Sequence, residues 1–345
     1  MTAFPKTSKN LSRRGFIGAS ALAPAALMLQ AGEAHAAANT RAQLAAVHSG
    51  SPAHQLLYKT DEFFIAHRGA GNISPEHTAY AYAESVRRGA LAVEISVRTT
   101  SDGQFVCMHD TNIKRTTGAS MDVRGHTLAE LRQYKVNMRK NLGEKTDLYD
   151  IPTLEEAIAA INAVPAGGEY ASVGGKKVVL FLEAKDGPAQ AGLVKFITER
   201  GLQRRTVIKM YRDGNGGFNP TSKYLKLANS AGCGTWCYFD GGDPIDKISA
   251  MARHENVDAI GVPYYEKPTG ASQGSMSEAN VRTLTGLGKA VIVWEIHRRS
   301  AYEKYKALGV KGFMCPDPYW VIGDPFDASV KIKTGKRPHG MLPAN

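Results

Sequence analysis

The apolar residues of this 345-residue chain gather in short runs, separated by stretches with helical spacing. Nine runs have the length and composition of buried strands, and helix signals lie between most of them. The runs cover residues 63–67, 91–97, 105–109, 178–184, 206–211, 235–239, 259–263, 291–296 and 312–316. Capping boxes, in which Ser or Thr is followed three residues later by Glu, predict helix starts at Thr127, Thr153 and Ser300.

The alternation of strands and helices predicts the fold class. Such strands pair in parallel through right-handed crossovers, so we predict an α/β fold, a closed (β/α)₈ TIM barrel over residues 61–325. The number of strands is irregular, because nine strand-like runs must fill the eight strand positions of such a barrel. Only Arg98–Gln104 joins the second and third runs, which is too short for a crossover helix. We expect a tight loop there, and we expect the long segment 110–177 to cover one side of the site.

The N-terminus carries an export signal. SRRGFI at residues 12–17 precedes an apolar, Ala-rich run, and AHA at residues 34–36 matches a cleavage site. This pattern is typical of a twin-arginine signal peptide. We assign it to residues 1–36, with cleavage near Ala36. A membrane anchor is disfavoured because the run is shorter than the ~20 residues of a span and contains Pro24. We therefore expect a periplasmic or secreted protein whose partner during export is the twin-arginine machinery.

The remaining composition restricts the partners. The formal net charge of +11 favours anionic partners such as phosphate esters, phospholipid surfaces or nucleic acid. The basic residues are spread along the chain, so we expect a solvated surface, no nucleic-acid partner and no stable membrane anchor. Residues 37–60 are predicted to be a linker or N-terminal arm, and residues 326–345 a C-terminal tail. Cys233 and Cys237 are close enough in sequence to pair, although their spacing alone does not decide it.

Chemically active side chains stand at the ends of the predicted strands, where α/β barrels build their sites. His67 and His109 each follow an apolar run, and two imidazoles can divide the roles of general acid and general base near neutral pH. Glu94 and Glu183 interrupt apolar runs. Buried carboxylates need a partner. That partner is either a bound cation or an internal salt bridge, for which Arg68 or Lys185 would be available.

Several motifs follow one another in a fixed order between about residues 62 and 320. They are His67-Arg68-Gly69, Pro75-Glu76-His77-Thr78, Glu94-Ile95-Ser96-Val97, Thr100-Ser101-Asp102-Gly103, His109-Asp110, residues 111–118, residues 151–156, Leu182-Glu183-Ala184-Lys185, Trp294 and residues 309–318. This ordered set resembles the glycerophosphodiester phosphodiesterase family. The resemblance implies a TIM barrel of the phospholipase C-like phosphodiesterase type. It also implies a small-molecule phosphodiester substrate, hydrolysed to glycerol 3-phosphate and an alcohol.

The resemblance also implies roles for individual residues. His67 and His109 would be the catalytic pair, and Glu94 and Glu183, with position 96, would bind a divalent cation, Ca²⁺ or Mg²⁺. Substrate contacts are implied or suggested for Arg68, Lys185, Glu76, Arg115 and Trp294. Arg115 could equally pin its loop, and for Trp294 a place in the barrel core is favoured over a substrate contact. Tyr211, Tyr238 and Tyr264, near strand ends, are expected mostly to pack.

Ser96 is the main departure from the family pattern, which has Asp there. Serine removes one negative charge from the expected cation site, so we expect weaker cation binding. Glu76, Glu295 and His297 are candidates to supply the missing ligand. A second departure is His77, where the family has Asn. Two alternatives to the leading function stay open: a phospholipase D-like enzyme acting on lipid headgroups, and a barrel that binds phosphate esters without turning them over.

Overall fold

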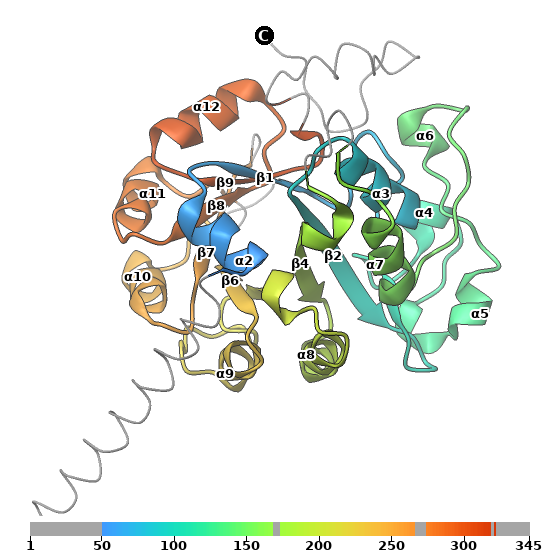
Figure 1. The fold of residues 1–345 in the computed structure, drawn as a ribbon, viewed down its shortest axis with the longest axis horizontal. Helices are drawn as coiled ribbons and strands as arrows, with labels where there is room; N and C mark the ends of the chain where they lie inside the picture. Colours follow the sequence, from blue (N-terminus) through green and yellow to red (C-terminus); the bar gives the residue numbers. More distant parts are fainter. Residues whose placement is uncertain (1–49, 168–172, 266–273, 319–320, 322–345) are drawn as a thin grey trace, which may run out of the picture. The chain divides into compact units, whose positions relative to one another are not determined.

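The computed structural model describes residues 50–167, 173–265, 274–318 and 321. Within them, eight parallel strands close into a barrel, with β1 pairing with both β9 and β2 (Figure 1). The barrel strands are β1 (Phe63–Ala66), β2 (Ala92–Thr99), β4 (Val179–Ala184), β5 (Thr206–Tyr211), β6 (Gly234–Tyr238), β7 (Ala259–Pro263), β8 (Ala290–Trp294) and β9 (Gly312–Cys315). The predicted fold class is confirmed.

The ninth predicted strand lies beside the barrel and forms a hairpin. Strand β3 (Phe105–Cys107) runs antiparallel to β2, with Val97 opposite Cys107 and Thr99 opposite Phe105. A two-stranded hairpin needs only a tight turn, whereas a parallel pair needs a crossover. This explains both the short connection and the nine runs for eight places. The backbone N–H of Met108 donates to the carbonyl of Ser96 at 3.0 Å, so the hairpin fixes the chain just before His109.

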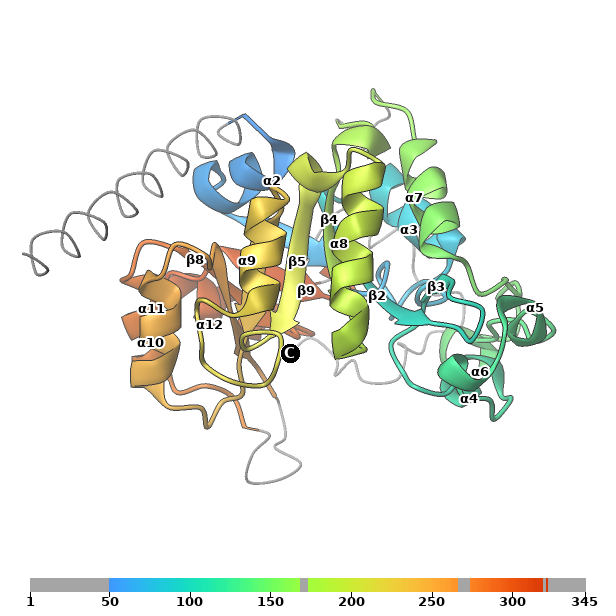
Figure 2. The ribbon, with the colours of Figure 1, turned by 90° about the horizontal axis from the view of Figure 1, so that it is seen from below.

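Helices on the outside connect the barrel strands, and Figure 2 shows α8 and α9 lying along the strands. The long helices are α3 (Ala79–Arg87), α7 (Leu154–Asn162), α8 (Gln190–Glu199), α9 (Lys223–Ser230), α10 (Ile245–Arg253), α11 (Glu278–Thr285) and α12 (Arg299–Ala307). Shorter pieces are α2 (Pro52–His54), η1 (Gln55–Lys59), α4 (Lys114–Thr117), η2 (Val123–Gly125), α5 (Leu128–Leu131), α6 (Arg139–Leu142), η3 (Gly175–Lys177), η4 (Gly187–Ala189) and η5 (Gln203–Arg205).

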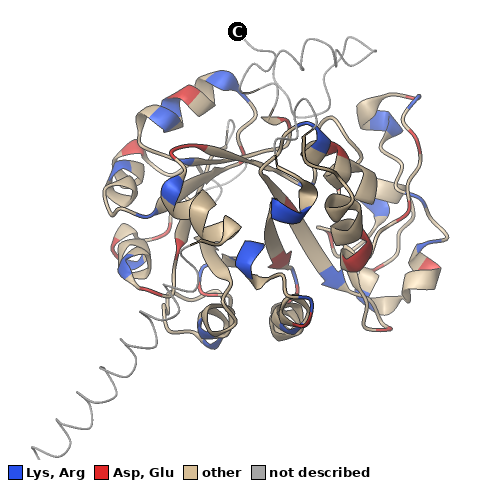
Figure 3. Cartoon of the chain, in the orientation of Figure 1, with Lys and Arg blue, Asp and Glu red and all other residues tan. Residues whose placement is uncertain are grey.

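Two of the three predicted helix starts are confirmed. Thr127 and Thr153 form complete capping boxes with Glu130 and Glu156. The start predicted at Ser300 is wrong, because the N-cap of α12 is Arg298, two residues earlier, and it makes no side-chain hydrogen bond. In the described part of the chain, no helix has the length and apolar character needed to cross a membrane. Basic and acidic segments are interspersed over the outer helices, as expected of a solvated surface (Figure 3).

The interior of the barrel is a separate apolar cluster from the layer between strands and helices. Trp236, Phe63 and Phe181 are its largest members, and Leu56 and Leu57 of η1 join it. The predicted linker or arm over residues 37–60 therefore contributes to the barrel core from α2 onward. Residues 1–49, with the predicted signal peptide, and the tail at 326–345 lie outside the described residues. All four cysteines are buried free thiols, so Cys233 and Cys237 are not paired here.

Gly261 on β7 has no room for a side chain inside the barrel. A Cβ there would lie 2.5 Å from the Cβ of Tyr238 and 2.6 Å from Nε1 of Trp236. We expect Gly261→Ala to lower the free energy of unfolding by about 1–3 kcal/mol through overpacking, measured by urea unfolding. Gly125→Ala is the matched control because its Cβ would meet nothing within 4 Å. Equal stability of the two variants would contradict this account of the barrel interior.

Candidate active site

Two buried carboxylates and a serine face the barrel interior near the carboxyl ends of β2 and β4. Glu94 and Ser96 are two residues apart on β2, so their side chains share one face of the strand. The register pairs Ser96 with Glu183 on β4. All three residues are buried. The structure therefore brings together the three positions predicted to form a cation site.

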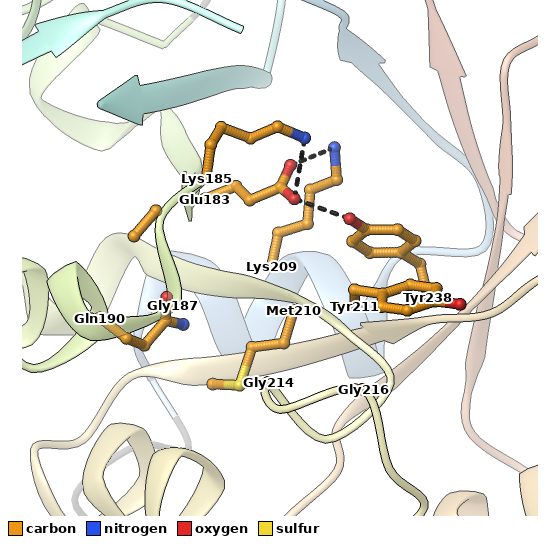
Figure 4. Close-up of a pocket in the computed structure, with 11 residues that line it drawn as sticks. Glu183, Lys185, Gly187, Gln190, Lys209, Met210, Tyr211, Gly214, Gly216 and Tyr238 are labelled. Atoms are coloured by element: carbon orange, nitrogen blue, oxygen red, sulfur yellow. Dashed lines mark hydrogen bonds and ion pairs between the residues drawn. The ribbon is translucent and has the colours of Figure 1, made fainter. Parts of the chain in front are cut away.

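Lys209 on β5 stands between the two carboxylates. Its Nζ lies 3.1 Å from Oε1 of Glu94 and 2.9 Å from Oε2 of Glu183, and Figure 4 shows its side chain beside that of Glu183. Leu182 pairs with Ile208, so the next residues along the two strands, Glu183 and Lys209, lie side by side. Lys209 was not among the residues predicted from the sequence to form the site. The available signal was a lysine inside the apolar run 206–211, the same anomaly that singled out the two glutamates.

Both carboxylates also accept hydrogen bonds from donors other than Lys209. The hydroxyl of Tyr238 donates to Oε1 of Glu183 at 2.7 Å, and Nζ of Lys185 donates to the same atom at 3.1 Å (Figure 4). The hydroxyl of Ser96 donates to Oε1 of Glu94 at 3.0 Å, and the backbone N–H of Arg68 donates to Oε2 at 3.1 Å. Tyr238, expected mostly to pack, does contact the rings of Trp236 and Trp294, and its hydroxyl also holds Glu183 in place. The two carboxylates therefore form internal salt bridges, one of the two alternatives predicted for them: Glu183 with Lys185 and Lys209, and Glu94 with Lys209.

The charges of Glu94, Glu183 and Lys209 stabilise one another. Burial by itself would raise the pKa of both carboxyls. Lys209 and Lys185 together outweigh burial at Glu183, whose pKa falls to about 2. At Glu94, Lys209 together with neighbouring groups such as Arg68 holds the pKa well below its usual range. Burial by itself would lower the pKa of Lys209, but Glu183 and Glu94 outweigh it and raise that pKa. All three groups therefore stay charged at neutral pH.

As arranged, these residues do not fit a divalent cation. Ca²⁺ and Mg²⁺ need about six or more oxygen ligands, several of them from carboxylates or water. Here Glu94 and Glu183 are bound to lysines, and the Ser96 hydroxyl is turned toward Glu94 as a donor. No group of three or more His, Cys, Asp or Glu side chains suited to a metal ion occurs among the described residues.

The candidates to replace the missing carboxylate are also engaged elsewhere. Glu76 binds both Arg115 and Arg68. Glu295 lies 3.3 Å from a ring nitrogen of His67 through one oxygen and 3.3 Å from His297 through the other. Neither side chain contacts Glu94 or Glu183 as a further ligand would.

His67 is buried at the end of β1, with a carboxylate near each ring nitrogen. Its Nδ1 lies 3.3 Å from Oε1 of Glu295, and its Nε2 lies 3.9 Å from Oε2 of Glu94. The ring therefore has an acceptor beside either nitrogen. The chain turns sharply here because Gly69 adopts φ 75°, and a Cβ at Gly69 would lie 3.0 Å from Cβ of Ala81.

His109 follows the β2–β3 hairpin and is oriented by its neighbour. Its Nδ1 lies 2.9 Å from Oδ1 of Asp110, and Arg98 donates to its backbone carbonyl at 3.0 Å. Burial lowers the pKa of His109, although Asp110 opposes the shift. The ring is therefore neutral at pH 7, and its Nε2 is the nitrogen left for proton transfer with a substrate.

Arg115 connects Glu76 with Asp110. It binds both carboxylate oxygens of Glu76 at 2.7 Å and Oδ2 of Asp110 at 2.6 Å. Such a two-point pair is geometrically specific, which favours loop pinning for Arg115. Burial would raise the pKa of Glu76, but the hydrogen bond from Arg115 and the charge of Arg68 lower it to about 2. Contact of Arg115 or Glu76 with substrate stays a prediction.

His77 and Trp294 border the site. Burial lowers the pKa of His77 to about 3, and its Nδ1 lies 2.6 Å from the Tyr82 hydroxyl, so it is an uncharged packed group. Trp294 ends β8, where its half-buried ring makes edge contacts with Tyr238 and Tyr265 at centroid distances of 5.6 and 5.9 Å. Trp294 thus belongs to the rim of the barrel core, and its contact with substrate stays a prediction.

A cavity of about 230 Å³ opens beside the ion pairs (Figure 4). Glu183, Lys185, Lys209, Tyr211 and Tyr238 are among the residues that line it. Lys185 and Lys209 against Glu183 leave one net positive charge among these lining side chains, which favours an anionic group.

Comparisons with known proteins show which family the chain resembles. The sequence model of the glycerophosphoryl diester phosphodiesterase family matches residues 67–207. The Bacillus subtilis homologue YhdW is 34% identical over 270 residues, covering 76% of this chain and 97% of that protein. This chain belongs to the glycerophosphodiester phosphodiesterase family. Its enzyme class is that of the phosphoric diester hydrolases.

Two further relatives extend the match. The glycerophosphodiester phosphodiesterase of Caldanaerobacter subterraneus is 30% identical over 264 residues, covering 75% of this chain and 95% of the enzyme. A solved phosphodiesterase of Oleispira antarctica, in complex with the product sn-glycerol-3-phosphate, superposes with a TM-score of 0.57 at 20% identity. The superposition covers 76% of this chain and 95% of the Oleispira antarctica chain. At 20% identity this structural similarity shows the fold alone, which is a TIM barrel.

Proposed function

We propose that this protein hydrolyses glycerophosphodiesters to glycerol 3-phosphate and an alcohol, with His67 and His109 as the acid–base pair. The observation that carries the proposal is the pair of histidines at strand ends, each with a carboxylate at Nδ1, from Glu295 and Asp110 respectively. A carboxylate there fixes the ring orientation and directs Nε2 to proton transfer. The product held by the Oleispira antarctica relative supports the choice of glycerol 3-phosphate.

The proposed reaction divides the proton transfers between the two rings. Nε2 of neutral His109 takes a proton from the nucleophile, which is water or the neighbouring glycerol hydroxyl; the latter would pass through a cyclic phosphate. The new phosphorus–oxygen bond forms as the bond to the alcohol breaks, and His67 gives a proton to the leaving oxygen. Arg68 and Lys185 supply positive charge to the phosphate oxygens. No step is assigned to a divalent cation, because Lys209 occupies the carboxylates expected to hold it.

The test is product analysis with the purified protein. Glycerophosphocholine and glycerophosphoethanolamine should each release one glycerol 3-phosphate and one alcohol, whereas p-nitrophenyl phosphate, a monoester, should not be cleaved. Lysophosphatidylcholine tests the lipid-headgroup alternative in the same assay. If wild type and His67→Ala release alcohol equally slowly from every substrate, this proposal fails, and the alternative of a barrel that binds phosphate esters without turnover is favoured.

We further propose that the chain is exported through the twin-arginine machinery and cleaved near Ala36. The support is the SRRGFI sequence at residues 12–17, followed by an apolar run and an A-x-A site. Fractionation of cells should find the wild-type protein processed and outside the cytoplasm. Replacing both Arg13 and Arg14 by lysine should leave the chain unprocessed inside, and normal processing of that variant would contradict the proposal.

A further inference from the structure

Lys209 occupies the position that a cation shared by Glu94 and Glu183 would take. Its nitrogen lies 3.1 Å from an oxygen of Glu94 and 2.9 Å from an oxygen of Glu183. Oxygen ligands lie about 2.3–2.6 Å from Ca²⁺. A calcium ion bound by the same two oxygens would therefore overlap the ammonium group.

The charges around Lys209 are already balanced. Glu183 has a second lysine, Lys185, on its other oxygen, together with the hydroxyl of Tyr238. Two carboxylates thus face two ammonium groups. Serine at position 96 is part of this balance, because aspartate there would add a third carboxylate directly opposite Glu183 in the β2–β4 register. Ser96 and Lys209 are therefore complementary: a neutral side chain at position 96 leaves two carboxylates, which Lys209 and Lys185 balance.

Lys209 is held firmly in this position. Its side chain is 8% exposed. Its Nζ lies 5.5 Å from the ring centroid of Trp236 and 5.2 Å from that of Tyr238, so aromatic rings help to enclose it. A divalent ion that displaced it would leave a buried ammonium without its two carboxylates, which is strongly unfavourable.

We propose that Lys209 replaces the divalent cation of the family, so that this enzyme hydrolyses its substrate without Ca²⁺ or Mg²⁺. Lys209 holds Glu94 and Glu183 in place, and with Lys185 it lends positive charge to the cavity that both lysines line. The activity part of this inference rests on the proposed phosphodiesterase function. The binding part stands by itself and is tested separately.

Calorimetry tests the binding part. Wild-type protein freed of metal with EDTA and dialysed is titrated with CaCl₂ and, separately, with MgCl₂. We expect no binding at this site tighter than about 1 mM, the weak end of natural Ca²⁺ sites. Glu183→Gln is the control for other sites. Wild-type binding that this variant abolishes would overturn the proposal, whereas binding that it leaves unchanged lies elsewhere and is consistent with the proposal.

A double variant tests whether the exchange can be reversed. Ser96→Asp combined with Lys209→Ser restores a third carboxylate and removes the ammonium. We expect this protein to bind Ca²⁺ at least tenfold more tightly than wild type, and Ser96→Asp alone to bind little better than wild type because Lys209 remains. Equal binding by wild type and a folded double variant would overturn the proposal. The wild-type titration decides the matter even if the double variant does not fold.

The activity part uses glycerophosphocholine hydrolysis by the same wild-type protein. We expect equal rates in EDTA, in Ca²⁺ and in Mg²⁺. A rate lost in EDTA and restored by either ion would overturn the proposal while leaving the proposed function intact. Absence of hydrolysis in all three conditions would contradict the proposed function and the activity part together, and the calorimetry would still decide whether Lys209 excludes the cation.

Discussion

Replacing His109 by alanine is expected to lower kcat/KM for glycerophosphocholine hydrolysis by about 100-fold or more, the scale for removing a general acid or base. The reason is geometric. Asp110 holds Nδ1 at 2.9 Å and Arg98 holds the backbone carbonyl, so the ring is fixed with Nε2 available. Alanine removes the proton acceptor but leaves the hairpin backbone in place. Steady-state kinetics on the two proteins measure the effect.

The pH dependence of kcat/KM separates this role from a structural one. A general base must be unprotonated, so activity rises as pH increases through its pKa. Burial lowers the pKa of His109. In the wild type, the fall of kcat/KM on the acid side of the pH profile should therefore have its midpoint below the ordinary histidine pKa of about 6.5. In His109→Ala that fall should disappear.

His126→Ala is the matched control for His109→Ala, because His126 lies in the same 110–177 segment and its ring binds only the backbone carbonyl of Asp122 among the contacts described for it. We expect its kcat/KM to stay within about twofold of wild type. If His109→Ala retained more than a third of wild-type activity, or kept the wild-type fall on the acid side of the pH profile, His109 would not be the base.

Most of the architecture could be predicted from local pattern. Three kinds of feature depend only on residues close together in the sequence, and the structure contains all of them. They are the strand runs, the capping boxes at Thr127 and Thr153, and the short Arg98–Gln104 connection. The exception at α12 is local as well: its first helical residue is Arg299, so Ser300 lies inside the helix and not at its cap.

The contacts of the site could not be predicted because they join distant residues through strand register. Lys209 lies 115 residues from Glu94 in the chain, and Arg115 lies 39 residues from Glu76. The sequence showed that Glu94 and Glu183 needed a positive partner, and it offered Arg68 or Lys185. Only the side-by-side placement of β4 and β5 shows that Lys209 is that partner for both glutamates.

Lys209→Met should cause the largest loss of stability among the variants considered. Methionine keeps the length of the side chain but leaves Glu94 and Glu183 buried without their shared positive charge. Removing one partner of a buried ion pair costs about 3–5 kcal/mol, so we expect a decrease of this size in the free energy of unfolding at pH 7. Urea unfolding measures it.

The loss caused by Lys209→Met should depend on pH in a defined direction. In the wild type, the pKa of Glu183 lies near 2, below the ordinary value of 4.5. The pair therefore stabilises the fold fully above about pH 4.5 and loses that contribution as pH falls toward 2. In the variant, protonation of the carboxyls removes the uncompensated charges. The difference between the two proteins should therefore be largest at pH 7 and shrink as the pH falls below about 4.

Lys185→Met is the matched control for Lys209→Met. Lys185 is more exposed, at 15%, and contacts only Glu183 of the two carboxylates. Lys185→Met should therefore lower the free energy of unfolding at pH 7 clearly less than Lys209→Met does, since Glu183 keeps Lys209 and Tyr238 as partners. Equal losses in the two variants, or a Lys209→Met effect that is the same at pH 7 and pH 3, would show that Lys209 does not act by compensating both buried carboxylates.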